Sequence, residues 1–205
     1  MDLIIVVEGI SAAGKTTWCR KHAPDRLVPE TFPSDRHLQP SEGQEPAEYW
    51  TNWNAKRWSD AVEIEENRGQ AVCDTDPLKL HFIWSLWQIG AAPESQWQHQ
   101  LAATEDAIAA RKLGFADLYF VKVIDPAVAR EQRDNDAMRQ RDRFDLHVLL
   151  QPTLVRWYKA LESALDGRVA WGLPELLPDP NGAVQNPFRY DVQRFREFTR
   201  SLVQS

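Results

Sequence analysis

The segment that most constrains the fold of this chain lies directly after its first predicted strand. The residues from Leu3 to Glu8 are rich in Ile and Val and predict a buried strand. The segment from Gly9 to Thr16 then matches the pattern G-x-x-x-x-G-K-[ST], and a helix is predicted from Lys15 to Lys21. In this context the N–H groups of the loop form a nest for an anion, and the helix adds the positive end of its dipole. The sequence therefore predicts a P-loop that holds the phosphates of a nucleotide.

Individual positions of the predicted P-loop have distinct chemical roles. Gly9 and Gly14 allow backbone angles and a close approach that a Cβ atom would obstruct. We expect Lys15 to place its charge beside the β- and γ-phosphates, Thr16 to offer its hydroxyl to Mg²⁺, and Thr17 to reach another phosphate oxygen. The predicted nucleotide-binding residues are Gly9, Ser11, Ala12, Ala13, Gly14, Lys15, Thr16 and Thr17.

Composition limits the classes of protein that this chain can belong to. Its 205 residues suffice for one domain with a sizeable core, and its content of 43% apolar and 26% charged residues is typical of a globular enzyme. A net charge of −6 disfavours general nucleic-acid binding, which usually needs a basic surplus. The chain has no apolar run of the ~20 residues that a membrane span needs, and the short run from Leu3 to Val7 after Asp2 is unlike a signal peptide. Because Cys19 and Cys73 lack metal-ligand spacing, we expect a cytoplasmic protein with reduced thiols.

Predicted strands and helices alternate along the chain. Strands are predicted at residues 3–8, 27–28, 70–73, 118–124 and 168–171. Helices are predicted at residues 15–21, 46–67, 77–89 and 95–113, from 126 into the charged stretch 130–143, around 150–161, and at 190–202. This alternation indicates a three-layer α/β/α fold of the P-loop NTPase type, with a central five-stranded parallel sheet. We expect a single domain over residues 1–205, with a helical lid at about residues 130–143.

Turn and cap residues mark the ends of several predicted helices. Asp76 is expected to cap a helix whose first position is Pro77, and Asp125 is expected to cap the helix that follows it in the same way. Gly114 is the predicted stop of the helix at 95–113, and Pro152 is the start of another helix or a kink in it. Ligands of parallel sheets bind beyond the carboxyl ends of the strands. The residues from Asp74 to Asp76 and from Asp125 onward are therefore expected to lie near the P-loop.

The reactions of several other P-loop classes are disfavoured by missing motifs. The chain has no Asn/Thr-Lys-x-Asp tetrapeptide to recognise guanine, no LSGGQ-like signature, and no Asp-Glu pair after a suitable strand. A small chain with a complete P-loop and none of these features favours a kinase that uses ATP and Mg²⁺.

The order of further segments resembles one branch of the P-loop kinases. A short strand leads to Glu30, Asp74 follows the third strand, and the segment from Ala116 to Pro126 leads into Arg130 and Arg133. This order is similar to that of the deoxynucleoside kinase and thymidylate kinase group over roughly residues 1–165. The resemblance implies a phosphotransferase that moves the γ-phosphoryl group of ATP to a hydroxyl or phosphate of a small molecule, first of all one like a nucleoside or nucleotide.

The resemblance also implies roles for two carboxylates. Glu30, in the segment Val28-Pro29-Glu30-Thr31, corresponds to the family's base toward a sugar hydroxyl, although an ordinary loop carboxylate is an equal alternative. Asp74 keeps the carboxylate that organises Mg²⁺ waters or the acceptor hydroxyl, so which of the two acts as the base stays open. Thr75 replaces an arginine that holds the acceptor in the family, and this departure opens the choice of acceptor.

The charged stretch from Arg130 to Arg143 contains five arginines in fourteen residues. One interpretation is a solvated helix with salt bridges. The other is a mobile lid that brings arginines onto the transferring phosphates, with Arg130 and Arg133 one helical turn apart as catalytic candidates. The remaining arginines of the stretch, which the sequence does not rank, are Arg139, Arg141 and Arg143.

The predicted acceptor pocket lies beside the helices that follow the second and third strands. We expect Trp53, Arg57 and Asp76 to contact the substrate, with a simple helix cap as the alternative for Asp76. The nine tryptophans are interpreted as a Trp-rich core or as an aromatic wall for a flat ligand. His81 is interpreted as a partly buried structural histidine, with a functional role as the alternative.

The complete prediction assigns Lys15, Glu30, Asp74, Arg130 and Arg133 to catalysis and Thr16 with Asp74 to Mg²⁺. The expected partner is a small-molecule acceptor, without nucleic acid or membrane, and a homodimer is left open. Two alternatives remain: a kinase of a non-nucleotide natural product or antibiotic, and a P-loop ATPase or switch that acts through a protein partner.

Overall fold

A computed structural model describes residues 2–40, 43–135, 144–180 and 184–204. Its centre is a parallel sheet in the order β2-β3-β1-β4-β5, which confirms the predicted five-stranded parallel sheet. The register places Val7 beside Asp74 and Gly9 beside Lys122, so the carboxyl ends of the three central strands meet at one edge. The strands are β1 (Leu3–Gly9), β2 (Leu27–Val28), β3 (Gln70–Asp74), β4 (Leu118–Lys122) and β5 (Val169–Trp171).

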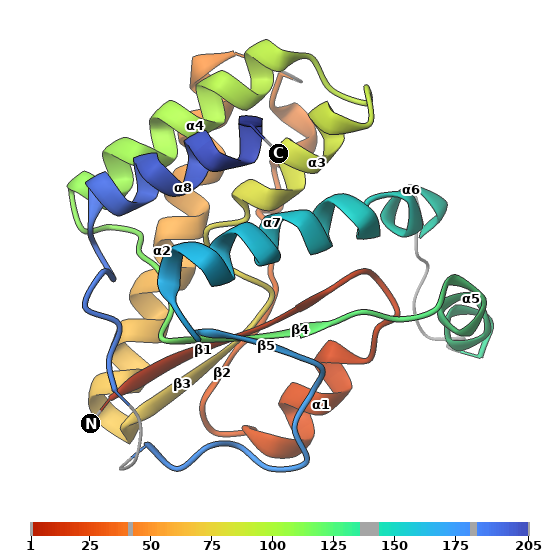
Figure 1. The fold of residues 1–205 in the computed structure, drawn as a ribbon, viewed down its shortest axis with the longest axis vertical. Coiled ribbons are helices and arrows are strands. Elements are labelled where there is room, and N and C mark those ends of the chain that lie inside the picture. The colour runs from red at the N-terminus through yellow and green to blue at the C-terminus, as the bar shows by residue number, and fades with distance from the viewer. Residues whose placement is uncertain (1, 41–42, 136–143, 181–183, 205) are drawn as a thin grey trace.

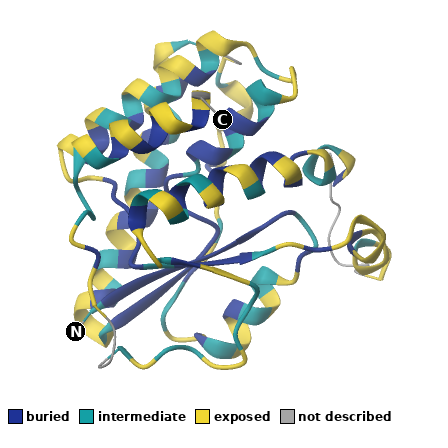
Figure 2. Cartoon of the chain, viewed as in Figure 1, coloured by how far each residue is buried: buried dark blue, intermediate teal, exposed yellow. Residues whose placement is uncertain are grey.

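Helices cover both faces of the sheet, as Figure 1 shows. Ile5 and Val7 of β1 pack on the side of the first helix, whereas Ile4 and Val6 belong to the larger core on the opposite side. This alternation follows from the two-residue period of a strand, and Figure 2 shows the strands buried and the helices exposed on their outer sides. The helices are α1 (Lys15–His22), α2 (Gln44–Arg68), α3 (Leu80–Gln88), α4 (Glu94–Ala109), α5 (Pro126–Asp134), α6 (Phe144–Leu149), α7 (Gln151–Leu165) and α8 (Val192–Gln204), with a 3-10 turn at Arg36–Leu38.

The tryptophans mainly form core. Trp58, Trp84, Trp97 and Trp157 are almost fully buried. The Trp157 ring lies 5.8 Å from that of Trp84 and 6.4 Å from that of Trp97, within the range of favourable aromatic pairs. The interpretation of a Trp-rich core is therefore the one that the structure supports.

The helix predicted from Pro77 begins three residues later. Lys79 is in the left-handed region, with φ of 51°, and α3 starts at Leu80. The residues before it form a turn, in which Lys79 N donates to Asp76 O at 3.0 Å and Leu78 N donates to Asp76 Oδ1 at 2.9 Å. Asp76 therefore caps a turn and not the helix, and the prediction of Pro77 as the first helical residue is wrong.

One other predicted helix boundary differs from the structure. The helix predicted to stop at Gly114 ends at Ala109, because Arg111 has φ of 57° and Lys112 N folds back to Ala107 O. Gly114 is instead required by packing, since a Cβ there would lie 2.5 Å from Arg189 O.

Asp125 caps α5 as predicted, accepting from Ala127 N at 2.7 Å. The structure describes α5 only as far as its end at Asp134 and a separate α6 from Phe144, so most of the predicted lid helix lies outside the described residues. Pro152 stands in the first turn of α7, which makes it a helix start and not a kink. Within the described part of the chain, no helix is long and apolar enough to cross a membrane.

Candidate active site

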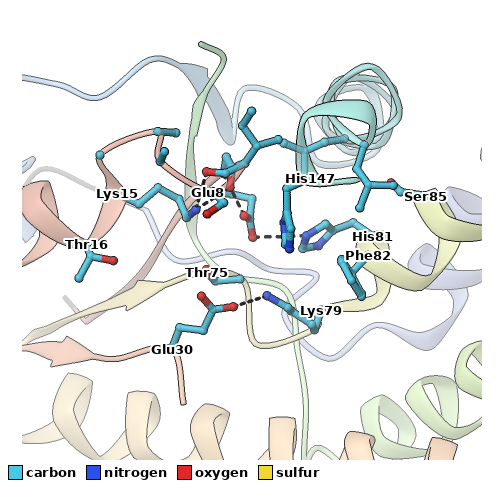
Figure 3. Close-up of a pocket in the computed structure, with 18 of the residues that line it drawn as sticks. Glu8, Lys15, Thr16, Glu30, Thr75, Lys79, His81, Phe82, Ser85 and His147 are labelled. Carbon is cyan, nitrogen blue, oxygen red and sulfur yellow. Dashed lines mark hydrogen bonds and ion pairs between the residues drawn. The ribbon is translucent and has the colours of Figure 1, made fainter. Parts of the chain in front are cut away.

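A cavity of about 950 Å³ lies at the carboxyl ends of β1 and β3 (Figure 3). All eight predicted nucleotide-binding residues line it, together with Glu30. No tryptophan is among the described residues that line this cavity, so the alternative interpretation of an aromatic wall of tryptophans is not supported at this site. The other lining residues include Glu8, Arg20, Phe32, Arg36, Thr75, Lys79, His81, Phe82, Ser85, His147, Leu150 and Leu154.

The P-loop backbone enters the left-handed region at one glycine and one alanine and passes close to β4 at Gly9. Gly14 has φ of 83° at the start of α1, and Ala12 has φ of 66°. A Cβ on Gly9 would lie 2.5 Å from Lys122 O, so only glycine fits where the loop passes β4. The Lys15 ammonium donates to Gly9 O at 2.6 Å and to Ile10 O at 3.1 Å. Its charge therefore lies inside the loop, at the place where phosphate oxygens are expected.

Thr16 and Asp74 form a direct hydrogen bond across the site. The Thr16 hydroxyl donates to Asp74 Oδ2 at 2.6 Å, while Asp74 Oδ1 is buried and has no hydrogen-bond partner among the described residues. A carboxylate and a hydroxyl beside a phosphate site are oxygen ligands of the type that Mg²⁺ uses, with water and phosphate supplying the rest. The Thr16–Asp74 pair therefore has the ligand types of the predicted magnesium site. The site stays a prediction, because Asp74 is not among the described residues that line the cavity and no cluster of three or more acidic, His or Cys ligands exists in the described part of the chain.

Glu30 is paired with a lysine that sequence reasoning did not single out. Lys79 Nζ donates to Glu30 Oε1 at 2.5 Å, and both side chains are about one-quarter to one-third exposed. Burial acts to raise the pKa of Glu30, but the charges of Lys79 and Lys15 outweigh it and lower the pKa to about 2. Glu30 is therefore ionised at neutral pH and positioned at the cavity wall.

Glu8 is the functional-site residue that the sequence analysis missed. Its carboxylate accepts from Gly9 N at 2.9 Å and from Asp76 N at 3.0 Å, and it lies 3.6 Å from His81 Nε2. Figure 3 shows the Lys15 and His81 side chains on opposite sides of it. Burial acts to raise the pKa of Glu8, but His81, Lys15 and the Gly9 N–H hold it below its ordinary value. An acidic residue at the end of an apolar strand, directly before the first P-loop glycine, was the available signal.

The three residues predicted to contact the substrate do not line the cavity. Arg57 is buried and its Nη2 donates to Asp74 O at 2.9 Å and to Thr75 O at 3.0 Å. Trp53 Nε1 donates to Thr31 O at 3.0 Å. These bonds hold the backbone around Glu30 and Asp74, so the structure gives Arg57 and Trp53 a positioning role in place of direct contact.

Asp76 is fully enclosed beneath the site. Its Oδ1 accepts from Leu78 N, and its Oδ2 accepts from the Tyr158 hydroxyl at 3.1 Å. Burial raises the pKa of Asp76 to about 7, and the charge of Glu8 adds to this increase. Asp76 therefore links the end of β3 to Tyr158 of α7 and does not line the cavity where we expected it to contact the substrate.

We predict that replacing Asp76 with asparagine stabilises the protein at pH 8 by up to a few kcal/mol. Between the ordinary pKa of 3.8 and the folded-state value of about 7, the folded protein keeps a proton that the unfolded chain has released. Stability of the natural protein therefore falls as pH rises through this range, whereas an amide is neutral throughout. Urea unfolding at pH 4 and pH 8 measures the effect, and an equal difference at both pH values would contradict it.

The described lid arginines face α6 and not the cavity. Arg130 Nε lies 4.0 Å from Asp145 Oδ1, and the Arg133 guanidinium pairs with Asp134 at 2.8 Å and stacks on the Phe144 ring at 4.6 Å. Neither Arg130 nor Arg133 lines the cavity, and their contact with phosphate stays a prediction. The other candidates, Arg139, Arg141 and Arg143, lie outside the described residues.

Solved structures of known proteins resemble this chain at low sequence identity. No protein-family model matches the chain, and no curated protein is similar to it in sequence. Deoxyadenosine kinase from M. mycoides with bound dATP is 12% identical, with a TM-score of 0.55, and the match covers 99% of this chain and 100% of that one. NadR protein in complex with NAD and AMP-PNP is 16% identical, with a TM-score of 0.54, over 97% of this chain and 50% of NadR.

A second structure of NadR protein, in complex with NR, is 15% identical with a TM-score of 0.57, over 97% of this chain and 52% of NadR. The chain thus spans about half the length of NadR. These similarities show that the chain shares the three-layer α/β fold of these proteins, as the sequence predicted.

Proposed function

We propose that this protein is a phosphotransferase that uses ATP and Mg²⁺ and moves the γ-phosphoryl group to a hydroxyl or phosphate of a small molecule. One observation carries the proposal: the complete P-loop and the ionised Glu30 line a single cavity. The structural neighbours add support for a nucleoside-like acceptor, because they include a deoxyadenosine kinase with dATP and NadR with NR.

The residues divide between the two ends of the transfer. The P-loop N–H groups and Lys15 bind the donor phosphates and stabilise the charge that develops during transfer. Thr16 and Asp74 would hold Mg²⁺, which when bound neutralises phosphate charge. Glu30, which lines the same cavity, would accept a hydrogen bond from the acceptor hydroxyl and orient it.

Glu30→Gln should lower kcat about 100-fold while changing KM for ATP less than threefold. Glutamine keeps the size of the side chain but cannot accept a proton from the acceptor hydroxyl. Steady-state kinetics with the best acceptor measures both constants. An unchanged kcat would make Glu30 an ordinary loop carboxylate and would move the role of the base to Asp74.

Lys79→Met provides a second, independent test of the role of Glu30. Removing the ammonium raises the pKa of Glu30, because Lys79 is the main charge that lowers it. Activity that depends on ionised Glu30 is lost as pH falls through its pKa. The acidic limb of the kcat profile should therefore move to higher pH in the Lys79 variant, and a limb that does not move would argue against Glu30 as the group involved.

The decisive test of the function is a MgATP assay with nucleosides, nucleotides and hydroxylated antibiotics, in which mass spectrometry identifies the product. A phosphorylated nucleoside or nucleotide supports the first proposal. Phosphate found only on an antibiotic would favour a kinase of a natural product. The specific observation behind this alternative is that Thr75 stands where the resembling family has an arginine that holds the acceptor. ATP hydrolysis without any phosphorylated compound would favour the ATPase or switch.

A further inference from the structure

Lys79 lies at the cavity wall in a backbone conformation that lysine rarely adopts. Its φ of 51° is in the left-handed region. The fold holds it there, because Lys79 N donates to Asp76 O at 3.0 Å and Lys79 O accepts from Phe82 N at 3.1 Å. Residues other than glycine with positive φ are uncommon, and they gather at functional sites where the surrounding structure maintains them. The direction of the Lys79 side chain is therefore a candidate functional feature.

The Lys79 ammonium has donors to spare inside the cavity. Its side chain is 25% exposed, so a ligand in the cavity can reach it. An ammonium carries three N–H donors. One of them donates to Glu30 Oε1, and the ammonium has no other hydrogen-bond partner among the described residues. Two donors are therefore available to an anionic ligand.

Lys79 and Lys15 act on the same carboxylate from different parts of the chain. Burial acts to raise the pKa of Glu30, but the charge of Lys79 and then that of Lys15 lower it to about 2. Figure 3 shows the Glu30 carboxylate turned toward Lys79, with Thr75 between the two lysines in this view. Lys15 belongs to the P-loop, where donor phosphates are expected, so the second lysine lies on the Glu30 side of the same cavity.

The proposed reaction brings the γ-phosphoryl group toward this second lysine. If Glu30 binds the acceptor hydroxyl, the γ-phosphorus must come within ~3.5 Å of that hydroxyl oxygen. The acceptor oxygen then bonds to phosphorus, the bond from phosphorus to the β–γ bridging oxygen breaks, and ADP leaves with the electron pair. The acceptor proton goes to Glu30. A carboxylate alone beside this group would repel its charge, whereas the ammonium bonded to Glu30 attracts it.

We propose that Lys79 is a second catalytic cation, whose ammonium donates to an oxygen of the transferring γ-phosphoryl group while it stays paired with Glu30. This inference rests on the proposed function and assigns a further residue to it. Lys15 and Lys79 would then stabilise the transferring group from the donor side and from the acceptor side.

A double variant without either charge of the pair separates this role from simple pairing with Glu30. In Glu30→Gln/Lys79→Met the carboxylate and the ammonium are both removed, so the net charge of the cavity equals that of the natural protein. AMP-PNP and ADP serve as probes that differ by the terminal phosphoryl group. Isothermal titration calorimetry on the full chain, with Mg²⁺ and without an acceptor, measures their dissociation constants.

We expect the preference for AMP-PNP over ADP to fall about tenfold in E30Q/K79M, because a hydrogen bond between charged groups is lost. The affinity for ADP should change less than twofold. Lys79→Arg keeps the charge and the donors and should keep most of the preference. Lys56→Met is the matched control, because Lys56 is exposed, does not line the cavity and has its ammonium 5.7 Å from the Trp53 ring, much as that of Lys79 lies 6.0 Å from Phe82.

The single variant Lys79→Met gives a second measurement that does not depend on the double variant. At alkaline pH Glu30 is ionised with or without Lys79, so a lysine that only lowers the pKa of Glu30 would leave the kcat plateau unchanged. We expect that plateau to fall about 100-fold.

A preference for AMP-PNP that falls less than threefold in E30Q/K79M, or a natural kcat plateau in K79M, would overturn the proposal and would make Lys79 only the partner of Glu30. These results are distinct from failure of the proposed function. That failure would be shown by the absence of any phosphorylated product from the natural protein, whereas the calorimetry needs neither an acceptor nor turnover.

Discussion

Lys15→Met should lower kcat for phosphoryl transfer by about 10³-fold, the scale on which positioned charges act in this reaction. Lys15 is the cation of the P-loop, and its ammonium bonds to the Gly9 and Ile10 carbonyl groups in the structure. Transfer of those bonds to phosphate oxygens would stabilise charge that increases in the transition state. Methionine keeps the length of the side chain without the charge. Single-turnover measurement with saturating MgATP and the best acceptor reports this step directly.

Lys21→Met is the matched control, because Lys21 is an exposed lysine of the same helix and does not line the cavity. This variant should retain the natural kcat. Both variants should unfold at nearly the same temperature as the natural protein. If K15M kept more than a tenth of the natural kcat, the P-loop mechanism would be wrong.

Asp74→Asn should lower kcat on the order of 10²- to 10³-fold and raise the Mg²⁺ concentration needed for half-maximal activity. The amide keeps one oxygen to accept from Thr16 but removes the charge and the second carboxylate oxygen, Oδ1, which is buried without a described partner. Burial raises the pKa of Asp74, so the neutral amide relieves a desolvated charge. We therefore expect Tm to stay the same or rise while activity falls.

A magnesium titration of activity, together with ATP binding in the absence of Mg²⁺, measures this prediction. Metal-free ATP binding should change little in D74N, whereas the activation curve should move to higher Mg²⁺. Asp60→Asn removes an exposed carboxylate from α2 and should leave both curves unchanged. Equal loss of metal-free binding and turnover in D74N would make Asp74 a structural residue.

The P-loop could be predicted from the sequence because its conformation is a local property. The strand, the glycine positions and the helix start are contiguous, and the geometry of Gly9 and Gly14 follows from the close contact and positive φ that each position requires. The Asp125 cap is local in the same way, since its carboxylate bonds to N–H groups two and three residues later. The parallel sheet followed from the alternation of strands and helices, so that the gathering of strand ends at one edge was also predictable.

The start of α3 shows where local signals were insufficient. Asp76 and Pro77 have the residue types of a helix start, but Asp76 is drawn into contacts with Tyr158 on α7 and with Glu8 through its own N–H. The chain turns at Lys79 and begins the helix at Leu80. Tertiary hydrogen bonds thus replaced the local cap, which no pattern within the segment reveals.

The sequence by itself determined the phosphate end of this protein, the type of sheet and the edge at which the site forms. Only the tertiary structure decided that Lys79 pairs with Glu30, that Glu8 faces His81, and that Arg57 donates to backbone carbonyl groups. The physical reason is that backbone conformation and capping depend on neighbours within a few residues. Charge pairing and desolvation depend instead on which distant segments the folded chain brings into contact and removes from water.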